Sequence, residues 1–265
     1  MQQKVLTMNP LRLEQMTMFD VAPEEVVQIA ADLGVPLVSF FTVEAMQGAR
    51  PVTHDNKRPV LERLCDAPVT VDTVEAFILG DDARQFESEI ALAAELGCRA
   101  IVALDIMAAD DNQAAEQLAG LCGLAQSYGL MVGLEPISMG RTRTIHDAVR
   151  VFDLAGASNA RMTLDLLHVM RTGTPLAEVA ALDPSLIGSA QVCDGPAKAP
   201  DDLLEEASFS RGIPGTGEFP IAEFLKLVPP AVPVGLEIPL KSHREAGMAA
   251  AQRSRLIVEA IAKFA

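Results

Sequence analysis

The sequence predicts an α/β protein with the (β/α)₈ TIM barrel fold in a single domain spanning residues 1–265. Short apolar runs and helical patterns alternate along the whole chain, as parallel barrels require. The length of 265 residues is slightly above the typical ~250 residues of such a barrel. A doubly wound open sheet shares the alternation, but the chain has neither the GxGxxG fingerprint nor a phosphate-binding P-loop. The closed barrel is therefore preferred.

The strand candidates are short apolar runs with β-branched residues, typical of parallel strands that are buried on both faces. They are LRLEQMTM (11–18), PLVSFFTV (36–43), PVTVDTVEAFIL (68–79), AIVALDIM (100–107), MVGLE (131–135), ARMTLD (160–165), LIGSAQ (186–191) and VPVGLE (232–237). The carboxyl ends of such strands meet at one mouth of the barrel, where active sites lie.

Helix candidates lie between these strands, and several begin with Pro or acidic residues and end at Gly. They cover residues 23–34, 82–97, 111–129, 144–156, 219–228 and 245–264. Two irregular stretches, 44–60 and 195–217, follow the second and the seventh strand. Because both leave strand carboxyl ends, we expect them to be loops that border the mouth and form substrate walls or lids.

The composition excludes several classes of function. A net charge of −15, no Trp and one Tyr disfavour nucleic acid, which needs basic patches and stacking platforms. No apolar run reaches the ~18 residues of a membrane span, and the first residues lack a signal-peptide core. The four cysteines show no CxxC spacing. These features favour a cytoplasmic protein with reduced thiols and a small polar substrate, without a nucleic-acid or membrane partner.

Four polar residues end the last four strand candidates, namely Glu135, Asp165, Gln191 and Glu237. Carboxylates that converge at one mouth repel each other unless a cation lies between them, and a hard divalent metal is the simplest such cation. Taken singly, each residue also has a structural interpretation. A carboxylate can form an ion pair, Asp165 can cap the next helix, and Gln191 can bond turn backbone.

The second half of the chain resembles the sugar phosphate isomerase/epimerase branch of the xylose isomerase-like barrel superfamily. The resemblance is carried, in order, by GLEP (133–136), LDLLH (164–168), QVCD (191–194), RGIPGTGEFP (211–220) and GLEIP (235–239). It implies that one divalent ion is bound by Glu135, Asp165, Gln191 and Glu237.

The resemblance also implies that His168 and Arg211 contact the substrate. Many members of the superfamily have His where Gln191 stands. The harder amide oxygen favours Mn²⁺ or Mg²⁺, with Co²⁺ and Zn²⁺ as alternatives. Barrels of this kind often pair through exposed helices, so a homo-oligomer is also considered.

The first functional hypothesis is an isomerase or epimerase of carbohydrate metabolism, acting on a sugar or a related polyol or keto compound. A divalent ion acidifies the C–H beside a carbonyl and stabilises the resulting enediolate. Glu135 and Glu237 would then remove and return the proton, with His168 as a further catalytic group that orients the substrate oxygens.

Two alternatives remain open. A Gln at this metal position also resembles 3-dehydroshikimate dehydratases, which are lyases, and His168 would be the candidate base in such an enzyme. A cyclic acid substrate would need a cation, which Arg211, Lys198, Arg141 or Arg143 could supply. The other alternative is a non-catalytic, metal-bearing barrel that binds a ligand. The abasic-site endonucleases of the same superfamily are disfavoured, because the chain has only four His and a large negative charge.

Overall fold

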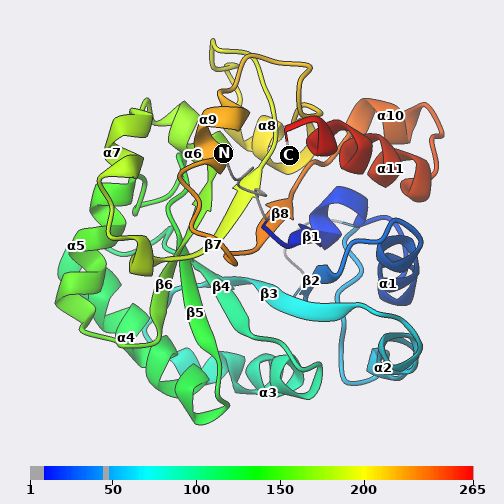
Figure 1. Cartoon of the computed structure of the whole chain (residues 1–265). Coiled ribbons are helices and arrows are strands. Elements are labelled where there is room, and N and C mark those ends of the chain that lie inside the picture. The colour runs from blue at the N-terminus through cyan, green and yellow to red at the C-terminus, as the bar shows by residue number, and fades with distance from the viewer. Residues whose placement is uncertain (1–8, 44–47, 265) are drawn as a thin grey trace, which may run out of the picture.

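The computed structural model describes residues 9–43 and 48–264 and shows a closed barrel of eight parallel strands in chain order. Strand β8 returns to pair with β1 and closes the ring. Figure 1 shows the strands at the centre with the helices around them. The strands are β1 (Leu11–Leu13), β2 (Leu37–Phe41), β3 (Thr70–Ile78), β4 (Ala100–Leu104), β5 (Met131–Glu135), β6 (Ala160–Asp165), β7 (Ile187–Val192) and β8 (Val234–Leu236). The predicted (β/α)₈ fold is confirmed.

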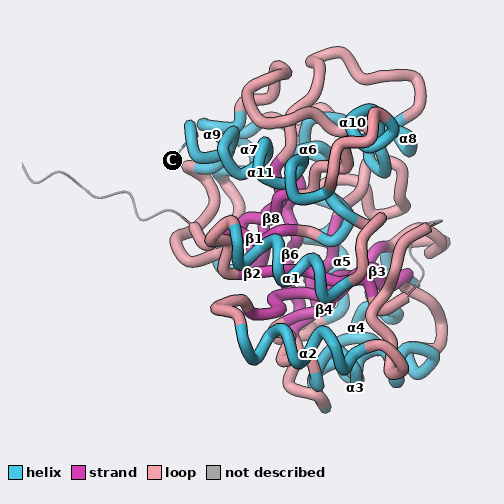
Figure 2. The backbone as a smooth tube through the Cα atoms, turned by 90° about the vertical axis from the view of Figure 1, so that its right-hand side faces the viewer, coloured by secondary structure: helices cyan, strands magenta, loops and turns pink. Residues whose placement is uncertain are grey.

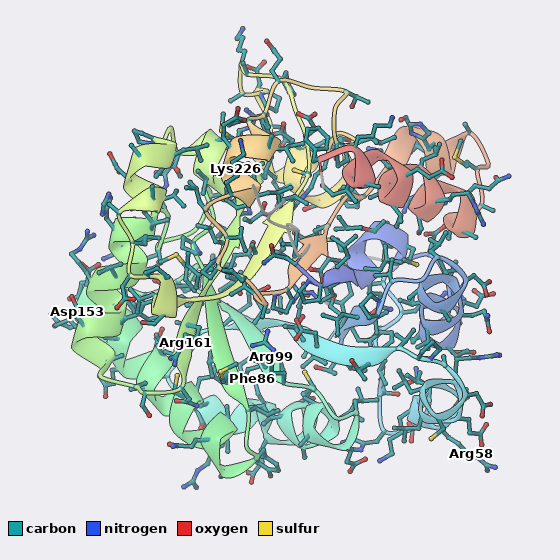
Figure 3. All side chains as sticks on the ribbon, in the orientation of Figure 1. Arg58, Phe86, Arg99, Asp153, Arg161 and Lys226 are labelled. Atoms are coloured by element: carbon teal, nitrogen blue, oxygen red, sulfur yellow. The ribbon has the colours of Figure 1, made fainter. Side chains whose placement is uncertain are left out.

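Helices cover the outside of the barrel, as the tube drawing in Figure 2 shows from a second direction. They are α1 (Pro23–Asp32), α2 (Lys57–Asp66), α3 (Glu87–Glu95), α4 (Asp111–Ser127), α5 (Ile145–Ala155), α6 (Leu166–Arg171), α7 (Leu176–Ala180), α8 (Leu203–Phe209), α9 (Ile221–Leu225), α10 (Lys241–Glu245) and α11 (Ala250–Ile261). Charged side chains project from their outer faces, such as Arg58 on α2 and Asp153 on α5 (Figure 3). Within the described ranges, no helix combines the length and apolar character needed to cross a membrane.

The strand register brings the predicted site residues to one end of the barrel. Asp165 at the end of β6 is the register partner of Gln191 on β7. Gln191 in turn pairs with Gly235 on β8, two residues before Glu237. Glu135 at the end of β5 is the register partner of Leu104 on the preceding strand, β4. The four polar residues therefore leave neighbouring strands at similar heights.

The side chains where β1 meets β8 leave no room for a Cβ atom at Gly235. A Cβ atom on Gly235 would lie 1.8 Å from Glu14 Oε1, so only glycine fits under this side chain. Beyond it, the Thr17 hydroxyl donates a hydrogen bond of 2.6 Å to the Leu236 carbonyl and accepts one of 2.8 Å from the Ile238 N–H. The two peptide groups that flank Glu237 are thus held by the segment that follows the first strand.

The structure corrects several predicted boundaries. The first strand was expected to reach residue 18, but β1 ends at Leu13 and Gln15–Met18 form a 3₁₀ turn. The last helix was expected over 245–264, but α11 begins only at Ala250. The shorter α10 precedes it and ends at Glu245, just before Gly247 with its φ of 80°.

Both predicted loops contain some helix. Of the stretch 44–60, residues 44–47 lie outside the described residues, and α2 already begins at Lys57. The stretch 195–217 includes α8, which Asp202 caps by accepting a 2.9 Å hydrogen bond from Glu205 N. An N-cap of this kind stabilises a short helix that its apolar periodicity alone does not reveal.

Candidate active site at the barrel mouth

The predicted metal ligands are buried together at the carboxyl end of the barrel. Glu135 and Glu237 are 6% and 4% exposed, Asp165 is 1% exposed, and Gln191 is fully buried. Asp165 also accepts a 2.8 Å hydrogen bond from Leu167 N and caps α6. Asp165 is therefore a helix cap, as one interpretation of the sequence predicted. Its other oxygen, Oδ2, faces the site, so Asp165 can still act as a ligand.

Arg211 lies between two of these carboxylates. Its Nη1 is 2.7 Å from Asp165 Oδ2, and its Nη2 is 2.7 Å from Glu237 Oε2. The third nitrogen, Nε, donates a 2.8 Å hydrogen bond to the Ala207 carbonyl at the end of α8. The arginine is only 5% exposed, so its charge compensates buried acids at the floor of the mouth.

Gln191 has no hydrogen-bond partner for either side-chain polar atom within the described part of the chain, although it is fully buried. An unpaired buried polar group costs about 1–3 kcal/mol, so this amide is expected to have a ligand that is not part of the protein. An amide oxygen beside three carboxylates is a donor set that suits a hard divalent ion. These residues therefore fit the metal that the sequence implies.

His168 lies beside the carboxylates but presents a proton to them. The Ser138 N–H donates a 3.2 Å hydrogen bond to His168 Nδ1, which places the ring proton on Nε2. Nε2 lies 3.7 Å from Glu135 Oε1 and 3.9 Å from Asp165 Oδ2. Burial lowers the pKa of His168 to about 4, so the ring is neutral.

This tautomer bears on how His168 can act. Potential ligand atoms of Glu135, Asp165 and His168 all lie within 4.8 Å of one another. A protonated Nε2 cannot coordinate a metal, however, and it cannot accept a proton. The hydrogen bond from Ser138 therefore favours His168 as a donor to substrate over a metal ligand or a general base.

Burial dominates the electrostatics of the two glutamates. It raises the pKa of Glu135 well above its usual value, and repulsion from Glu237 and Asp165 adds to the effect. Burial likewise raises the pKa of Glu237 to about 8, although Arg211 acts in the opposite direction. Acids with raised pKa values that lie in a cleft are candidates for proton transfer.

Asp194 organises the loop that carries Arg211. Its carboxylate accepts hydrogen bonds of 2.8, 2.9 and 3.0 Å from the N–H groups of Gly215, Gly217 and Phe219. A Cβ on Gly217 would lie 2.4 Å from Asp194 Oδ1, which explains the glycine in RGIPGTGEFP. This motif therefore positions Arg211 through backbone geometry.

A cavity of about 470 Å³ lies beside these residues. Its polar lining comes from Glu75, Glu135, His168, Ser208, Arg211 and Glu237. The rest of its lining is apolar and consists of Met16, Phe41, Val43, Ala76, Ile78, Phe86, Val102, Leu104, Ile106, Ile137, Met139, Leu204 and Ala207. The cavity is thus lined mostly by apolar side chains, with a small number of acids, His168, Ser208 and Arg211 among them.

Of the four cations proposed for an acidic substrate, only Arg211 lines this cavity. Arg141 forms a 2.6 Å ion pair with Asp111, and Arg143 donates to the Ser138 carbonyl. Lys198 is exposed on the loop after β7.

Sequence reasoning assigned no role to Glu75. It lies on β3, is 5% exposed and contributes to the cavity wall. Burial raises the pKa of its carboxyl group well above the usual value, and the neighbouring Glu14 adds to this. The available signal was a charged residue inside the apolar run 68–79.

Comparisons with known proteins agree with this architecture. The chain is 27% identical over 227 residues to a 3-dehydroshikimate dehydratase of Pseudomonas aeruginosa; the match covers 84% of the chain but only 31% of that protein. The chain therefore spans about a third of the length of this curated relative.

Solved structures with the same fold include the IOLI protein with a bound zinc atom, at a TM-score of 0.78, 16% identity and coverage of 97% and 99% of the two chains. An L-ribulose 3-epimerase superposes with a TM-score of 0.67 at 16% identity, covering 97% of each chain. At these identities the superpositions establish the fold. The sequence profile of the xylose isomerase-like TIM barrel family matches residues 16–257. The chain belongs to the xylose isomerase-like TIM barrel family.

Proposed function

We propose that this protein is a divalent-metal-dependent isomerase or epimerase that acts on a small hydroxy carbonyl compound through an enediolate. The observation that carries the proposal is the buried amide of Gln191 among Glu135, Asp165 and Glu237, which has no hydrogen-bond partner in the described part of the chain. A bound divalent ion would supply a Lewis acid that acidifies the C–H between the carbonyl and hydroxyl groups.

The side chains beside the cavity would perform the proton transfers. Glu135 and Glu237 come from β5 and β8 and both line the cavity. One of them takes the proton from the substrate carbon, and the other returns it to the same or the adjacent carbon. His168 donates its Nε2 proton to the oxygen on which negative charge develops, a role that its neutral tautomer suits. Arg211 completes the charge balance around the enediolate.

A lyase of the 3-dehydroshikimate dehydratase type is the second candidate. The curated relative carries this name, and Gln191 also resembles those enzymes. We propose it second for two reasons. Arg211, the one proposed carboxylate partner in the cavity lining, already pairs with Asp165 and Glu237. His168, its candidate base, is protonated at Nε2.

Proton exchange in deuterated water distinguishes the two reactions. The Mn²⁺-loaded protein is incubated with ketoses, cyclic polyol ketones and 3-dehydroshikimate, and the products are examined by NMR. An isomerase or epimerase incorporates solvent deuterium at the carbon beside the carbonyl, whereas a dehydratase releases water and forms a conjugated product. Glu135→Gln is the matched control and should abolish either reaction. A protein that binds a divalent ion but exchanges no proton would refute the proposal and favour the non-catalytic, metal-bearing barrel. A protein that takes up no divalent ion would refute both.

A further inference from the structure

The part of the cavity wall that lies across the barrel from Gln191 is mainly apolar. By strand order, β2, β3 and β4 lie across the barrel from β6, β7 and β8. The residues that β2–β4 and the segments following them contribute to the wall include Phe41, Ile78, Phe86, Leu104 and Ile106. Phe86 is labelled beside the strands in Figure 3. A substrate that spans the cavity therefore meets hydrocarbon at its far end.

Glu75 is a polar residue within this mainly apolar wall. It is 5% exposed, and within the described part of the chain its only hydrogen bond from a hydroxyl or N–H group is a long one of 3.4 Å from Thr73 Oγ1. The carboxyl group of Glu14 also lies within hydrogen-bond range of it. No ion pair is formed by Glu75 among the described residues. A buried carboxyl group without a cation is costly, and an aliphatic side chain would match the neighbouring wall residues better.

The residues behind Glu75 explain why it lacks a cation. Arg12 is fully buried and forms ion pairs with Glu14 and with Asp72. Asp72 also pairs with Arg99, whose Nε lies 2.7 Å from Oδ1. The nearby positive charges are therefore engaged by other acids. Glu14 is fully buried as well, and its Oε2 has no hydrogen-bond donor within the described ranges.

We propose that Glu75 contacts the substrate by hydrogen-bonding a hydroxyl or carbonyl group at the end remote from Gln191, and that this end of the substrate is uncharged. Glu14 lies behind Glu75 and acts as a positioning residue, because Arg12 fixes it by a 2.8 Å hydrogen bond. A phosphate or carboxylate at this end would have to lie among aliphatic and aromatic side chains and next to a carboxyl group. The proposal rests on the proposed function, and it names the substrate class as neutral hydroxy ketones with an apolar face.

Binding of a neutral probe tests the contact without requiring turnover. The probe 4-(hydroxymethyl)cyclohexane-1,2-diol, called the diol below, carries vicinal hydroxyls for the metal site and a third hydroxyl across an apolar ring. In 3,4-dihydroxycyclohexane carboxylate a charged group replaces that third hydroxyl. In calorimetry with the Mn²⁺-loaded protein, we expect the diol to bind more tightly than the carboxylate. Glu75→Leu should weaken diol binding about tenfold or more, as expected for the loss of a buried hydrogen bond. Glu75→Gln should retain part of the affinity, because an amide still bonds a hydroxyl.

The control variant carries the same Glu→Leu substitution at a surface position. Glu62 is exposed on α2 and lies outside the cavity lining, so Glu62→Leu should leave diol binding unchanged. Melting temperature and Mn²⁺ affinity are measured for all variants. Glu75→Leu should keep its metal and unfold at the same or a higher temperature, because a costly buried acid has been removed. A purely structural role would instead lower its melting temperature.

Measurements of KM and kcat distinguish a failure of this inference from a failure of the proposed function. With a substrate found by proton exchange, Glu75→Leu should raise KM about tenfold with a smaller change in kcat. A wild-type protein that turns over no carbonyl compound but loses diol binding in Glu75→Leu would refute the function and retain the contact. Equal binding of the diol by wild type and Glu75→Leu, no diol binding by the wild type, or tighter binding of the carboxylate would overturn the inference.

Discussion

Arg211 and Asp165 form a buried ion pair, with Nη1 of the arginine 2.7 Å from Oδ2 of the aspartate. Asp165 is also a predicted metal ligand, and its other oxygen is engaged by Leu167 N. A metal ion that binds Asp165 must therefore share Oδ2 with the guanidinium or displace it. Arg211 and the metal are thus alternative sources of positive charge for the same carboxylates.

This relationship predicts the behaviour of Arg211→Met. Without the guanidinium, Asp165 and Glu237 lose the cation that pairs with both of them, and breaking a buried ion pair costs roughly 3–5 kcal/mol. We expect the metal-free variant to melt well below the wild type, and Mn²⁺ to raise its melting temperature by more than it raises that of the wild type. Thermal unfolding with and without Mn²⁺ measures both values. An equal metal-induced shift in the two proteins would show that Arg211 and the metal act at separate sites.

The second prediction concerns Gln191. Gln191→His should fold and shift metal preference toward Co²⁺ or Zn²⁺, because imidazole suits softer ions than an amide oxygen does. Gln191→Leu is the control, since it fills the space without a donor atom and should weaken binding of all divalent ions. Competition between Mn²⁺ and Zn²⁺ monitored by metal analysis gives the preference. If Gln191→Leu binds Mn²⁺ as the wild type does, Gln191 is not a ligand.

His168→Asn separates substrate contacts from metal contacts. Because Nε2 carries the proton, we expect Mn²⁺ affinity to change little while turnover falls roughly a hundredfold or more, as for other lost catalytic donors. In Ser138→Ala the backbone N–H that fixes the tautomer remains, so this variant should keep most of its activity. Loss of metal from His168→Asn would instead identify His168 as a ligand.

The stability of the metal-free protein should depend on pH above neutrality. The pKa of Glu237 rises from 4.5 to about 8 on folding, so the folded protein binds more protons than the unfolded chain over this interval. Stability must then fall as pH increases. The pKa of His168 falls from 6.5 to about 4 on folding, which has the opposite effect, mainly below pH 6.5.

Urea unfolding at pH 6.5 and pH 8 therefore reports mainly on the carboxyl groups. The metal-free wild type should be less stable at the higher pH, and Glu237→Gln should show a smaller difference between the two values. Mn²⁺ should restore stability at pH 8 in the wild type. A metal-free protein that gains stability over this range would contradict the raised pKa of Glu237.

Sequence patterns were most informative where burial alone determines structure. The runs 131–135 and 160–165 coincide with β5 and β6, because strands buried on both faces are continuously apolar. The first strand was predicted too long for a reason that lies elsewhere in the chain. Gln15 uses its side chain to accept from Phe41 N at 2.7 Å and to donate to the Arg50 carbonyl at 2.7 Å. Such long-range bonds turn the chain at a point where its apolar pattern continues.

In the candidate site too, the features set by strand burial could be predicted, and those set by long-range contacts could not. Strand ends identified the residues that the barrel brings to one mouth, because parallel strands share a direction. The sequence could not show that Arg211 bridges Asp165 and Glu237, which are 46 and 26 residues away from it. Nor could it show that Glu75 faces the cavity, because alternate residues of a strand buried on both faces look alike in the sequence.

The Thr17 hydroxyl forms hydrogen bonds with the peptide groups on both sides of Glu237. This has a consequence for variation in this protein. Glu237 is aligned by a hydroxyl group more than 200 residues earlier in the chain, and Gly235 leaves the space for Glu14. A change in the first strand region can therefore alter proton transfer without touching the cavity. The segment after β1 and the segment around β8 must change together if the mouth of the barrel is to keep its geometry, so segments exchanged between relatives should carry β1 and β8 as one unit.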